Sequence, residues 1–209
     1  MDHGWLSQGS TSSADVRQSY DGWAGTYNDD LDAWDYRAPA KAAELLRDAV
    51  APSSSLLDAG CGTGLVGQAL RDAGFSGALD GIDLSPPSLE EARALGIYRD
   101  LRAANLQELP LSTGDNAYDA VICVGVLTYV PDSEAVLREF ARLVRPGGVV
   151  LATQRDDLYR ARAFDLTIQG LVDAAVFSEA DIAAPEPYLP NNPDFGSVIK
   201  VIHAVLSVA

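Results

Sequence analysis

The chain is poor in cysteine, histidine and positive charge, and it has no long apolar run. Its 209 residues include two cysteines and two histidines, and 30 Asp and Glu stand against 15 Lys and Arg, for a formal net charge of −15. Two cysteines cannot build a disulfide framework or a four-cysteine zinc site. A surface this acidic repels phosphate backbones, which disfavours a nucleic-acid partner. No apolar stretch approaches the ~20 residues of a membrane span, and the acidic, polar start is unlike a signal peptide. We therefore expect a cytoplasmic protein with no membrane attachment.

The length and composition indicate one folded domain. Hydrophobic residues make up 47% of the chain and charged residues 22%, as in ordinary globular proteins, and the length suits a single core. Residues 1–13, which are rich in Ser and Gly, predict a flexible leader before a single domain over 14–209. Within that domain, helices are expected over 14–50, alternating strands and helices over 54–155, and one helix with terminal strands over 156–209.

From residue 54 onwards the pattern alternates between strand and helix. The run 117–126 is apolar almost throughout, as in a strand that is covered on both faces. This βαβα order predicts an α/β fold, a doubly wound Rossmann-like sheet that is mostly parallel. The predicted strands are 54–58, 78–84, 98–103, 117–126, 149–153 and 197–206. The predicted helices are 14–27, capped by Ser12 or Ser13, then 36–50, 65–73, 87–95 and 133–144.

A glycine-rich turn follows the first predicted strand. Asp58 ends that strand, and Gly60, Gly62 and Gly64 follow it. Alternating glycines let the backbone turn tightly and approach a ligand closely, and the next helix offers free N–H groups. Asp83 ends the second strand, where an acid can accept hydrogen bonds from two ribose hydroxyls. Because ligands of such sheets bind at the carboxyl ends of the strands, this turn predicts a nucleoside site.

Two cofactor classes fit the turn. Residues 62–67 match G-x-G-x-x-G, a pattern of nicotinamide dinucleotide sites. A dinucleotide brings its pyrophosphate close to the turn, however, and the carboxylate of Asp58 would repel it. S-adenosylmethionine carries an ammonium and a sulfonium but no phosphate, so it suits an acidic approach. The residues favour S-adenosylmethionine. The alternatives are a dinucleotide and a tight turn that binds no ligand.

These motifs together resemble those of class I S-adenosylmethionine-dependent methyltransferases. Residues 58–64 (D-A-G-C-G-T-G) resemble the first motif of that superfamily, and Asp83 resembles its ribose-binding acid. Residues 118–121 resemble its fourth-strand motif, and 143–148 the turn before its fifth strand. The resemblance implies a seven-stranded sheet with an antiparallel last strand and S-adenosylmethionine as the cofactor.

A narrower resemblance extends over the N-terminal part. Residues 20–28 (Y-D-G-W-A-G-T-Y-N) and 36–39 (Y-R-A-P) are similar to the N-terminal segment of the Williams–Beuren syndrome chromosome-region methyltransferase-like family. This similarity implies a helical lid whose Tyr20, Trp23 and Tyr27 close over the cofactor. Aromatic residues at helical spacing more often belong to a core, which is the alternative.

The resemblance also implies individual contacts with the cofactor. Leu84 would pack on the adenine, Asn105 and the N–H of Leu106 would bond its ring, and a carbonyl of Cys123 or Val124 would bind the ammonium. Arg37 is the candidate for the methionyl carboxylate, with a surface ion pair as the alternative. The predicted cofactor-binding residues are Tyr20, Trp23, Tyr27, Arg37, Asp58, Gly60, Cys61, Gly62, Asp83, Leu84, Asn105, Leu106, Cys123 and Val124.

The methyl acceptor is expected to be a small molecule. In-line methyl transfer mainly requires that the reactants are positioned and that water is excluded. Tyr129 and Asp132 are the candidates for any acid–base role. The alternative for Asp132 is that it caps a loop. Strand 117–126 ends in apolar residues and glycine, so no metal site is expected. The candidate acceptor walls are Trp34, Tyr129, Tyr159, Phe164 and Tyr188. The alternatives are an NAD-dependent oxidoreductase, a catalytically silent nucleoside-binding protein and a protein methyltransferase; a monomer or a homodimer is expected.

Overall fold

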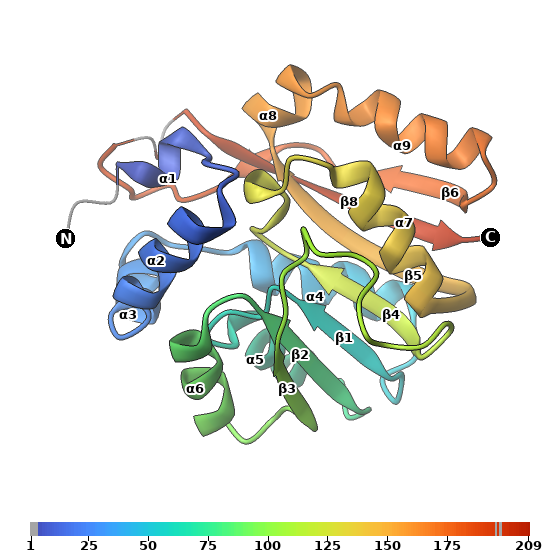
Figure 1. The fold of residues 1–209 in the computed structure, drawn as a ribbon, viewed down its shortest axis with the longest axis horizontal. Helices are drawn as coiled ribbons and strands as arrows, with labels where there is room; N and C mark the ends of the chain where they lie inside the picture. The colour runs from blue at the N-terminus through green and yellow to red at the C-terminus, as the bar shows by residue number, and fades with distance from the viewer. Residues whose placement is uncertain (1–3, 195, 197) are drawn as a thin grey trace.

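One sheet with helices on both faces forms the molecule (Figure 1). The computed structural model describes residues 4–194, 196 and 198–209. The strand order is β3-β2-β1-β4-β5-β8-β6, with the short β7 paired to β8. The strands are β1 (Leu56–Ala59), β2 (Leu79–Asp83), β3 (Asp100–Ala103), β4 (Tyr118–Cys123), β5 (Val144–Arg155), β6 (Phe177–Ile182), β7 (Glu186–Pro187) and β8 (Lys200–Val208).

The pairing confirms the predicted Rossmann-like class. The neighbours among β1 to β5 are parallel, and β8 is antiparallel to both β5 and β6. The predicted antiparallel last strand is therefore present, and the two-residue β7 raises the number of strands from seven to eight. β8 begins at Lys200 rather than at residue 197, which lies outside the described residues.

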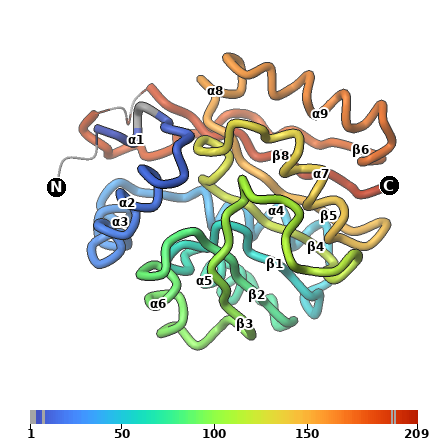
Figure 2. Tube along the Cα trace, in the orientation of Figure 1, coloured from blue at the N-terminus to red at the C-terminus, as the bar shows by residue number. Residues whose placement is uncertain are grey.

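The helices enclose the sheet in two layers. Residues of α7 and α9 pack on one face, and residues of α4 and α5 pack on the other. Figures 1 and 2 show α1, α2 and α3 grouped at the left of the view. The helices are α1 (Trp5–Gln8), α2 (Ser13–Trp23), α3 (Tyr27–Ala33), α4 (Ala38–Ala49), α5 (Leu65–Asp72), α6 (Pro86–Ala94), the 3₁₀ turn η1 (Leu127–Tyr129), α7 (Ser133–Leu143), α8 (Asp156–Ala161) and α9 (Phe164–Asp173).

The N-terminal part differs from its prediction in two respects. Part of the segment predicted as a flexible leader is folded, because Leu6 of α1 is buried in a cluster with Trp23 and Leu31; residues 1–3 lie outside the described residues. The helix predicted over 14–27 is two helices, α2 and α3, since the chain turns at Ala24 to Thr26. The start of α2 agrees with the prediction, because the Ser12 side chain accepts the N–H of Asp15 at 3.4 Å.

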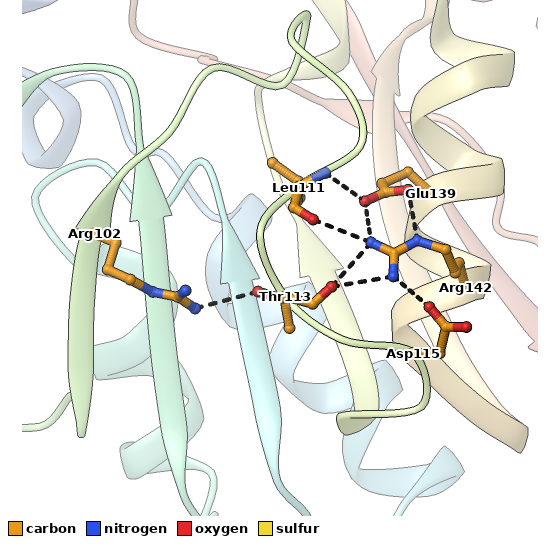
Figure 3. A network of polar contacts seen from close by, with 6 residues as sticks. All are labelled: Arg102, Leu111, Thr113, Asp115, Glu139 and Arg142. Carbon is orange, nitrogen blue, oxygen red and sulfur yellow. Dashed lines mark hydrogen bonds and ion pairs between the residues drawn. The ribbon is translucent and has the colours of Figure 1, made fainter.

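Arg142 of α7 anchors the loop between β3 and β4 (Figure 3). Its guanidinium donates to the carbonyls of Leu111 and Thr113 and forms ion pairs with Asp115 and Glu139. The buried Glu139 carboxylate also accepts the N–H of Leu111 at 2.7 Å. Arg142 holds the pKa of Glu139 below its usual range, so the network fixes both the loop and a buried charge.

Replacing Arg142 with Met should destabilise the fold. The Met side chain keeps the apolar stem but leaves Glu139 buried without its cation, so we expect a loss of about 2–3 kcal/mol in unfolding free energy. The matched control is Arg138→Met on the same helix, whose pair with Glu134 is exposed and worth ~0.5 kcal/mol or less. Urea unfolding compares the two variants, and equal midpoints would show that the network does not stabilise the loop.

Candidate functional site

A cleft of about 750 Å³, counting space open to solvent, lies at the carboxyl ends of β1, β2 and β4. The glycine turn, the end of β2, the loop after β3 and the helix α2 form its walls. The predicted cofactor residues that line it are Tyr20, Tyr27, Gly60, Gly62, Asp83, Leu84, Asn105, Leu106 and Val124. Sequence reasoning missed Ser13, Val16, Arg17, Ser85, Gln107, Val126 and Val130, which also line the cleft. Most of the missed residues lie on the lid or on loops, where no motif marks them.

The glycine turn folds back onto β2. The N–H groups of Gly60 and Cys61 both donate to the carbonyl of Ile82, at 2.7 and 3.0 Å. Gly60 and Gly62 have φ values of +80° and +53°, the left-handed region that favours glycine. A Cβ at Gly60 would lie 2.2 Å from a methyl group of Val126, whereas a Cβ at Gly62 would meet no atom within 4 Å. Because Gly62 lines the cleft, this open space adjoins the cleft.

Asp83 presents a carboxylate that the backbone holds in place. Its two oxygens accept the N–H groups of Gly62 and Ser85, each at 2.8 Å. Burial raises the pKa of this carboxyl, while those amide hydrogen bonds oppose the rise. Each oxygen keeps a second lone pair, and the side chain lines the cleft. The geometry therefore suits the acceptance of two hydroxyl hydrogen bonds.

Replacing Asp83 with Ala should weaken nucleoside binding. The variant loses acceptors for the ribose hydroxyls and also the partner of the Gly62 N–H. We expect S-adenosylhomocysteine to bind about 1.5–3 kcal/mol more weakly, which corresponds to roughly tenfold to 150-fold. Asp83→Asn retains one acceptor oxygen and should fall between the Ala variant and the wild type. Calorimetric titration measures these affinities, and a change within error would place the ribose elsewhere.

The loop after β3 forms the other end of the cleft. The Asn105 amide oxygen accepts the N–H of Gln107 at 3.0 Å, and its nitrogen donates to Ser13 and Glu108. Gln107 in turn donates to the carbonyls of Thr11 and Tyr129. Asn105 therefore joins the lid helix to this loop, and its side chain already has partners on both atoms.

The helix α2 crosses the cleft as a lid. The Ser85 hydroxyl, two residues after Asp83, donates to Asp21 of α2 at 2.6 Å. The Thr63 hydroxyl of the glycine turn donates to Asn28 of α3, also at 2.6 Å. Two polar contacts thus join α2 to the end of β2 and α3 to the glycine turn.

Some aromatic residues of α2 and α3 line the cleft, and others pack in the hydrophobic cluster behind it. Tyr20 and Tyr27 line the cleft. Trp23 is 2% exposed and packs against Tyr27, at 4.6 Å between ring centroids, and against Trp34 at 5.7 Å. The expected cofactor contact of Trp23 and acceptor contact of Trp34 are therefore absent from the described cleft, because both rings belong to the cluster that supports the lid.

Asp58 lies beneath the turn and does not line the cleft. Side chains alternate along a strand, so the neighbours Leu57 and Ala59 pack under α7 while Asp58 points to the face covered by α4 and α5. The Tyr98 hydroxyl donates to one of its oxygens at 2.7 Å, and the other oxygen has no hydrogen-bond partner among the described residues. Burial raises the pKa of Asp58 to about 7.

Both cysteines are also buried away from the cleft. Burial is the main cause that raises the pKa of the Cys61 and Cys123 thiols. The backbone N–H of Cys61 donates to the carbonyl of Ile82 within the glycine turn, and Cys123 lies within β4. The side chains of the two residues are thus not part of the cleft wall, whereas the neighbouring Val124 is.

The structure does not support a cofactor contact for Arg37. Its side chain is 78% exposed, and its Nε lies 2.7 Å from Asp35, so the surface ion pair is the arrangement observed. Among the residues that the structure describes, Arg17 of α2 is the cation that lines the cleft. Arg17 also lies 3.5 Å from Asp21.

The candidates for catalysis and acceptor binding named below are spread over four places. Tyr129 lines the cleft, and Asp132 instead caps α7 by accepting the N–H of Ala135 at 2.9 Å. Tyr159 and Phe164 pack together at 5.5 Å between centroids in the core under α9, away from the cleft. Tyr188 packs against Tyr36 at 5.5 Å. Only Tyr129 of the expected acceptor walls thus lines the described cleft.

The core of the chain matches a family model described as "Methyltransferase domain" over residues 57–152. Residues 57–152 are a methyltransferase domain. This range contains the glycine turn, Asp83 and the loop after β3, so the match covers the cleft just described. S-adenosylmethionine, the cofactor expected from the sequence, is the one of the two that suits a methyltransferase domain, so the match disfavours the nicotinamide alternative.

The chain is also similar in sequence to named methyltransferases and in fold to solved methyltransferase structures. Human methyltransferase-like protein 27 is 37% identical over 166 residues, which cover 76% of this chain and 66% of that protein. The ubiquinone biosynthesis O-methyltransferase of Bordetella avium is 39% identical over 99 residues, 46% of this chain and 40% of the enzyme. The chain thus spans slightly less than two thirds of the first relative and under half of the second. A solved Thermotoga maritima structure, a possible histamine N-methyltransferase, covers 91% of this chain and 98% of its own with a TM-score of 0.65; at 16% identity it shows the fold alone.

The described residues offer neither a cluster of metal ligands nor a membrane-spanning helix. In residues 4–194, 196 and 198–209, no group of three or more His, Cys, Asp or Glu side chains is placed to hold a metal ion. Within the same residues, no helix is both long and apolar enough to cross a membrane. The buried His203 of β8 instead has its Nε2 3.2 Å from the carbonyl of Ala38 and is 1% exposed.

Proposed function

We propose that the whole chain transfers the methyl group of S-adenosylmethionine to a small-molecule acceptor, at a nitrogen, oxygen or sulfur atom. The observation that carries this proposal is the cleft that α2 partly covers, which is lined by the carboxylate of Asp83 and by the open space at Gly62. A lid that covers the site leaves room for a small acceptor rather than for a folded protein surface. Relatives named for ubiquinone biosynthesis and for possible histamine methylation support an acceptor of this size.

The residues of the cleft fit the cofactor. Asp83 accepts the two ribose hydroxyls, and the apolar side chains of Leu84 and Leu106 line the cleft where they can flank the adenine. When bound, S-adenosylmethionine supplies a methyl group that is already activated by its positively charged sulfur. The buried carboxyl of Asp58 lies below the turn, and one of its oxygens has no hydrogen-bond partner among the described residues.

The chain's own contribution to the reaction is to orient the reactants and to exclude water. Tyr20 of α2, Tyr27 of α3 and Tyr129 of η1 line the cleft together with the glycine turn. Burial raises the pKa of the Tyr129 phenol, so this side chain stays protonated and donates hydrogen bonds rather than abstracting protons. Positioning of this kind accounts for roughly 7–11 kcal/mol in well-oriented systems.

A transfer assay with a methyl-labelled cofactor tests the proposal. The full chain is incubated with labelled S-adenosylmethionine and separate panels of small amines, thiols and phenols, and an unfolded protein extract serves as the macromolecular control. We expect label in at least one small-molecule panel and S-adenosylhomocysteine binding in a parallel titration. Binding without transfer to any panel would identify a catalytically silent nucleoside-binding protein, and label only in the extract would identify a protein methyltransferase. The cytoplasmic location and the monomeric or dimeric state remain predictions that fractionation and light scattering address.

A further inference from the structure

Tyr98 does not line the cleft, but its hydroxyl bonds a residue directly below the glycine turn. It lies in the short connection between α6 and β3, and it donates to one oxygen of Asp58 in β1 at 2.7 Å. The Asp58 side chain is fully buried, and its other oxygen has no hydrogen-bond partner among the described residues. Because a buried carboxyl without hydrogen bonds is unfavourable, the contact with Tyr98 determines how this carboxyl is held.

Three glycines leave the space that the Tyr98 ring occupies. A Cβ at Gly67 of α5 would collide with the Tyr98 hydroxyl oxygen. A Cβ at Gly81 of β2 would lie 3.0 Å from a carbon of the same ring, and one at Gly64 would lie 3.3 Å from another. These distances are too short for side chains at Gly67 or Gly81 unless the ring moves, so the ring fills a slot between α5 and β2.

Gly67 shows that this slot has a cost. It lies inside α5, where glycine stabilises a helix less than alanine does. The backbone there is helical and does not itself require a glycine. Gly67 is also the third glycine of the G-x-G-x-x-G pattern over residues 62–67. The glycine at this position is therefore explained by the space that Tyr98 needs, and not by a dinucleotide.

Tyr98 contacts the chain on both sides of the glycine turn. Its hydroxyl holds Asp58, on the strand that enters the turn, and its ring lies against Gly64 and Gly67, where the chain enters α5. One side chain thus fixes the end of β1 relative to the start of α5. The shape of the turn depends on that relation, and small displacements of a binding site can cost much of its affinity.

We propose that Tyr98 is a positioning residue of the cofactor site, which acts through Asp58 and keeps the glycine turn in the shape that binds S-adenosylmethionine. This inference rests on the proposed methyl transfer, since it adds a supporting residue to the same site. Tyr98 does not touch the cleft, so its effect on the cofactor passes through the residues that it holds. An oxygen of Asp58 can accept the phenol proton whether the carboxyl is ionised or not.

Tyr98→Phe tests the hydroxyl, because it keeps the ring in the slot and removes only the bond to Asp58. We expect S-adenosylhomocysteine to bind roughly threefold to tenfold more weakly, the range of one hydrogen bond. Calorimetric titration measures the affinity well below the denaturation temperature, where a loss of stability alone does not change it. An unchanged affinity beside a lowered urea midpoint would overturn the proposal, since Tyr98 would then only stabilise the fold.

Tyr118→Phe is the matched control. The Tyr118 hydroxyl donates to the buried carboxyl of Asp80 at 2.9 Å, so it forms the same kind of pair. Tyr118 begins β4, at the end of the strand opposite to the cleft, and it does not line the cleft. We expect this variant to lose stability and to bind S-adenosylhomocysteine as the wild type does. An equal loss of affinity in both variants would overturn the specific role of Tyr98.

Substitutions of Asp58 test whether Tyr98 acts through this residue. Asp58→Asn keeps an oxygen that accepts the Tyr98 hydroxyl, so its affinity should stay near that of the wild type. Asp58→Leu removes the acceptor and should bind as weakly as Tyr98→Phe, and the double variant should lose no more than Asp58→Leu alone. Additive losses, or a loss in Asp58→Asn equal to that in Tyr98→Phe, would overturn the proposed route.

Gly67→Ala tests the slot without changing Tyr98 or Asp58. The new methyl group would push the hydroxyl away from Asp58, so we expect weaker binding of S-adenosylhomocysteine although alanine favours the helix. Gly170→Ala in α9 is the control, because a Cβ there meets no atom within 4 Å. Unchanged affinity in Gly67→Ala would contradict the role of the slot, and it decides the outcome if Asp58→Leu does not fold.

The inference and the proposed function fail by different results. Absence of S-adenosylhomocysteine binding by the wild type would contradict the proposed methyl transfer. Normal binding by Tyr98→Phe, measured beside a wild type that binds, would contradict only the role of Tyr98. A wild type that binds the nucleoside but transfers no methyl group would contradict the proposed function and leave the affinity comparison valid.

Discussion

Gly62→Val is expected to abolish binding of S-adenosylhomocysteine while the protein remains folded. A Cβ at this position meets no protein atom within 4 Å, and the position lines the cleft, so the added side chain would occupy the ligand's volume. The left-handed backbone, with φ at +53°, adds a strain of roughly 1–2 kcal/mol for a residue with a side chain. We expect the affinity to fall by more than about a hundredfold, equivalent to ~3 kcal/mol, in a calorimetric titration.

Gly96→Val is the matched control for this effect. Gly96 has a φ of +64°, close to that of Gly62, and a Cβ there also meets no atom within 4 Å. It follows α6 and does not line the cleft. The two variants should lose similar stability in thermal unfolding, but Gly96→Val should bind the nucleoside as the wild type does. If both variants bind normally, the glycine turn is not part of the site.

Asp58→Asn is expected to change how stability depends on pH. Burial raises the pKa of Asp58 to about 7 from its ordinary 3.8. Between these two values the folded chain holds a proton that the unfolded chain has released, so stability falls as the pH rises from about 4 to about 7. For this group alone the fall is about 4 kcal/mol. The Asn variant should lack this component and so gain stability relative to the wild type as the pH rises.

Urea unfolding at pH 5, 6, 7 and 8 measures the difference between Asp58→Asn and the wild type. The unpaired amide of the new side chain adds a constant offset, because it does not titrate. Asp80→Asn serves as the contrast, since Arg99 and Tyr118 keep the pKa of Asp80 below its usual range. Removing Asp80 should therefore cost more stability at neutral pH than at acidic pH. If Asp58→Asn differs from the wild type by the same amount at every pH, the raised pKa is contradicted.

The elements that the sequence predicts best are those with short-range signals. The order of β1, the glycine turn and α5 follows from an apolar strand, three glycines and a helical stripe within one short stretch of the chain. The Ser12–Ser13 pair likewise predicts the start of α2, and the structure shows that Ser12 is the cap. In these places the residues that determine the structure are neighbours in the chain, so the sequence pattern predicts the structure without knowledge of the fold.

The placements that the sequence does not reveal depend on tertiary contacts. Asp58 lies at the end of the predicted strand, but the face to which it points follows from the packing of Leu57 and Ala59 under α7. Arg37 precedes α4, pairs with Asp35 at the surface and does not line the cleft. A hydrogen bond from the Arg155 side chain to a backbone carbonyl of α1 spans 149 residues, and nothing in the local sequence at either end shows that α1 contacts the end of β5.

The position of β8 in the sheet determines the order in which the strands can pair during synthesis. β8 lies between β5 and β6 and bonds both of them along most of its nine residues. As the polypeptide leaves the ribosome, β5 and β6 emerge before the strand that joins them, so both have unpaired edges at that stage. The half of the sheet that carries β1 to β4 can assemble earlier, and the part beside Arg155 is completed last.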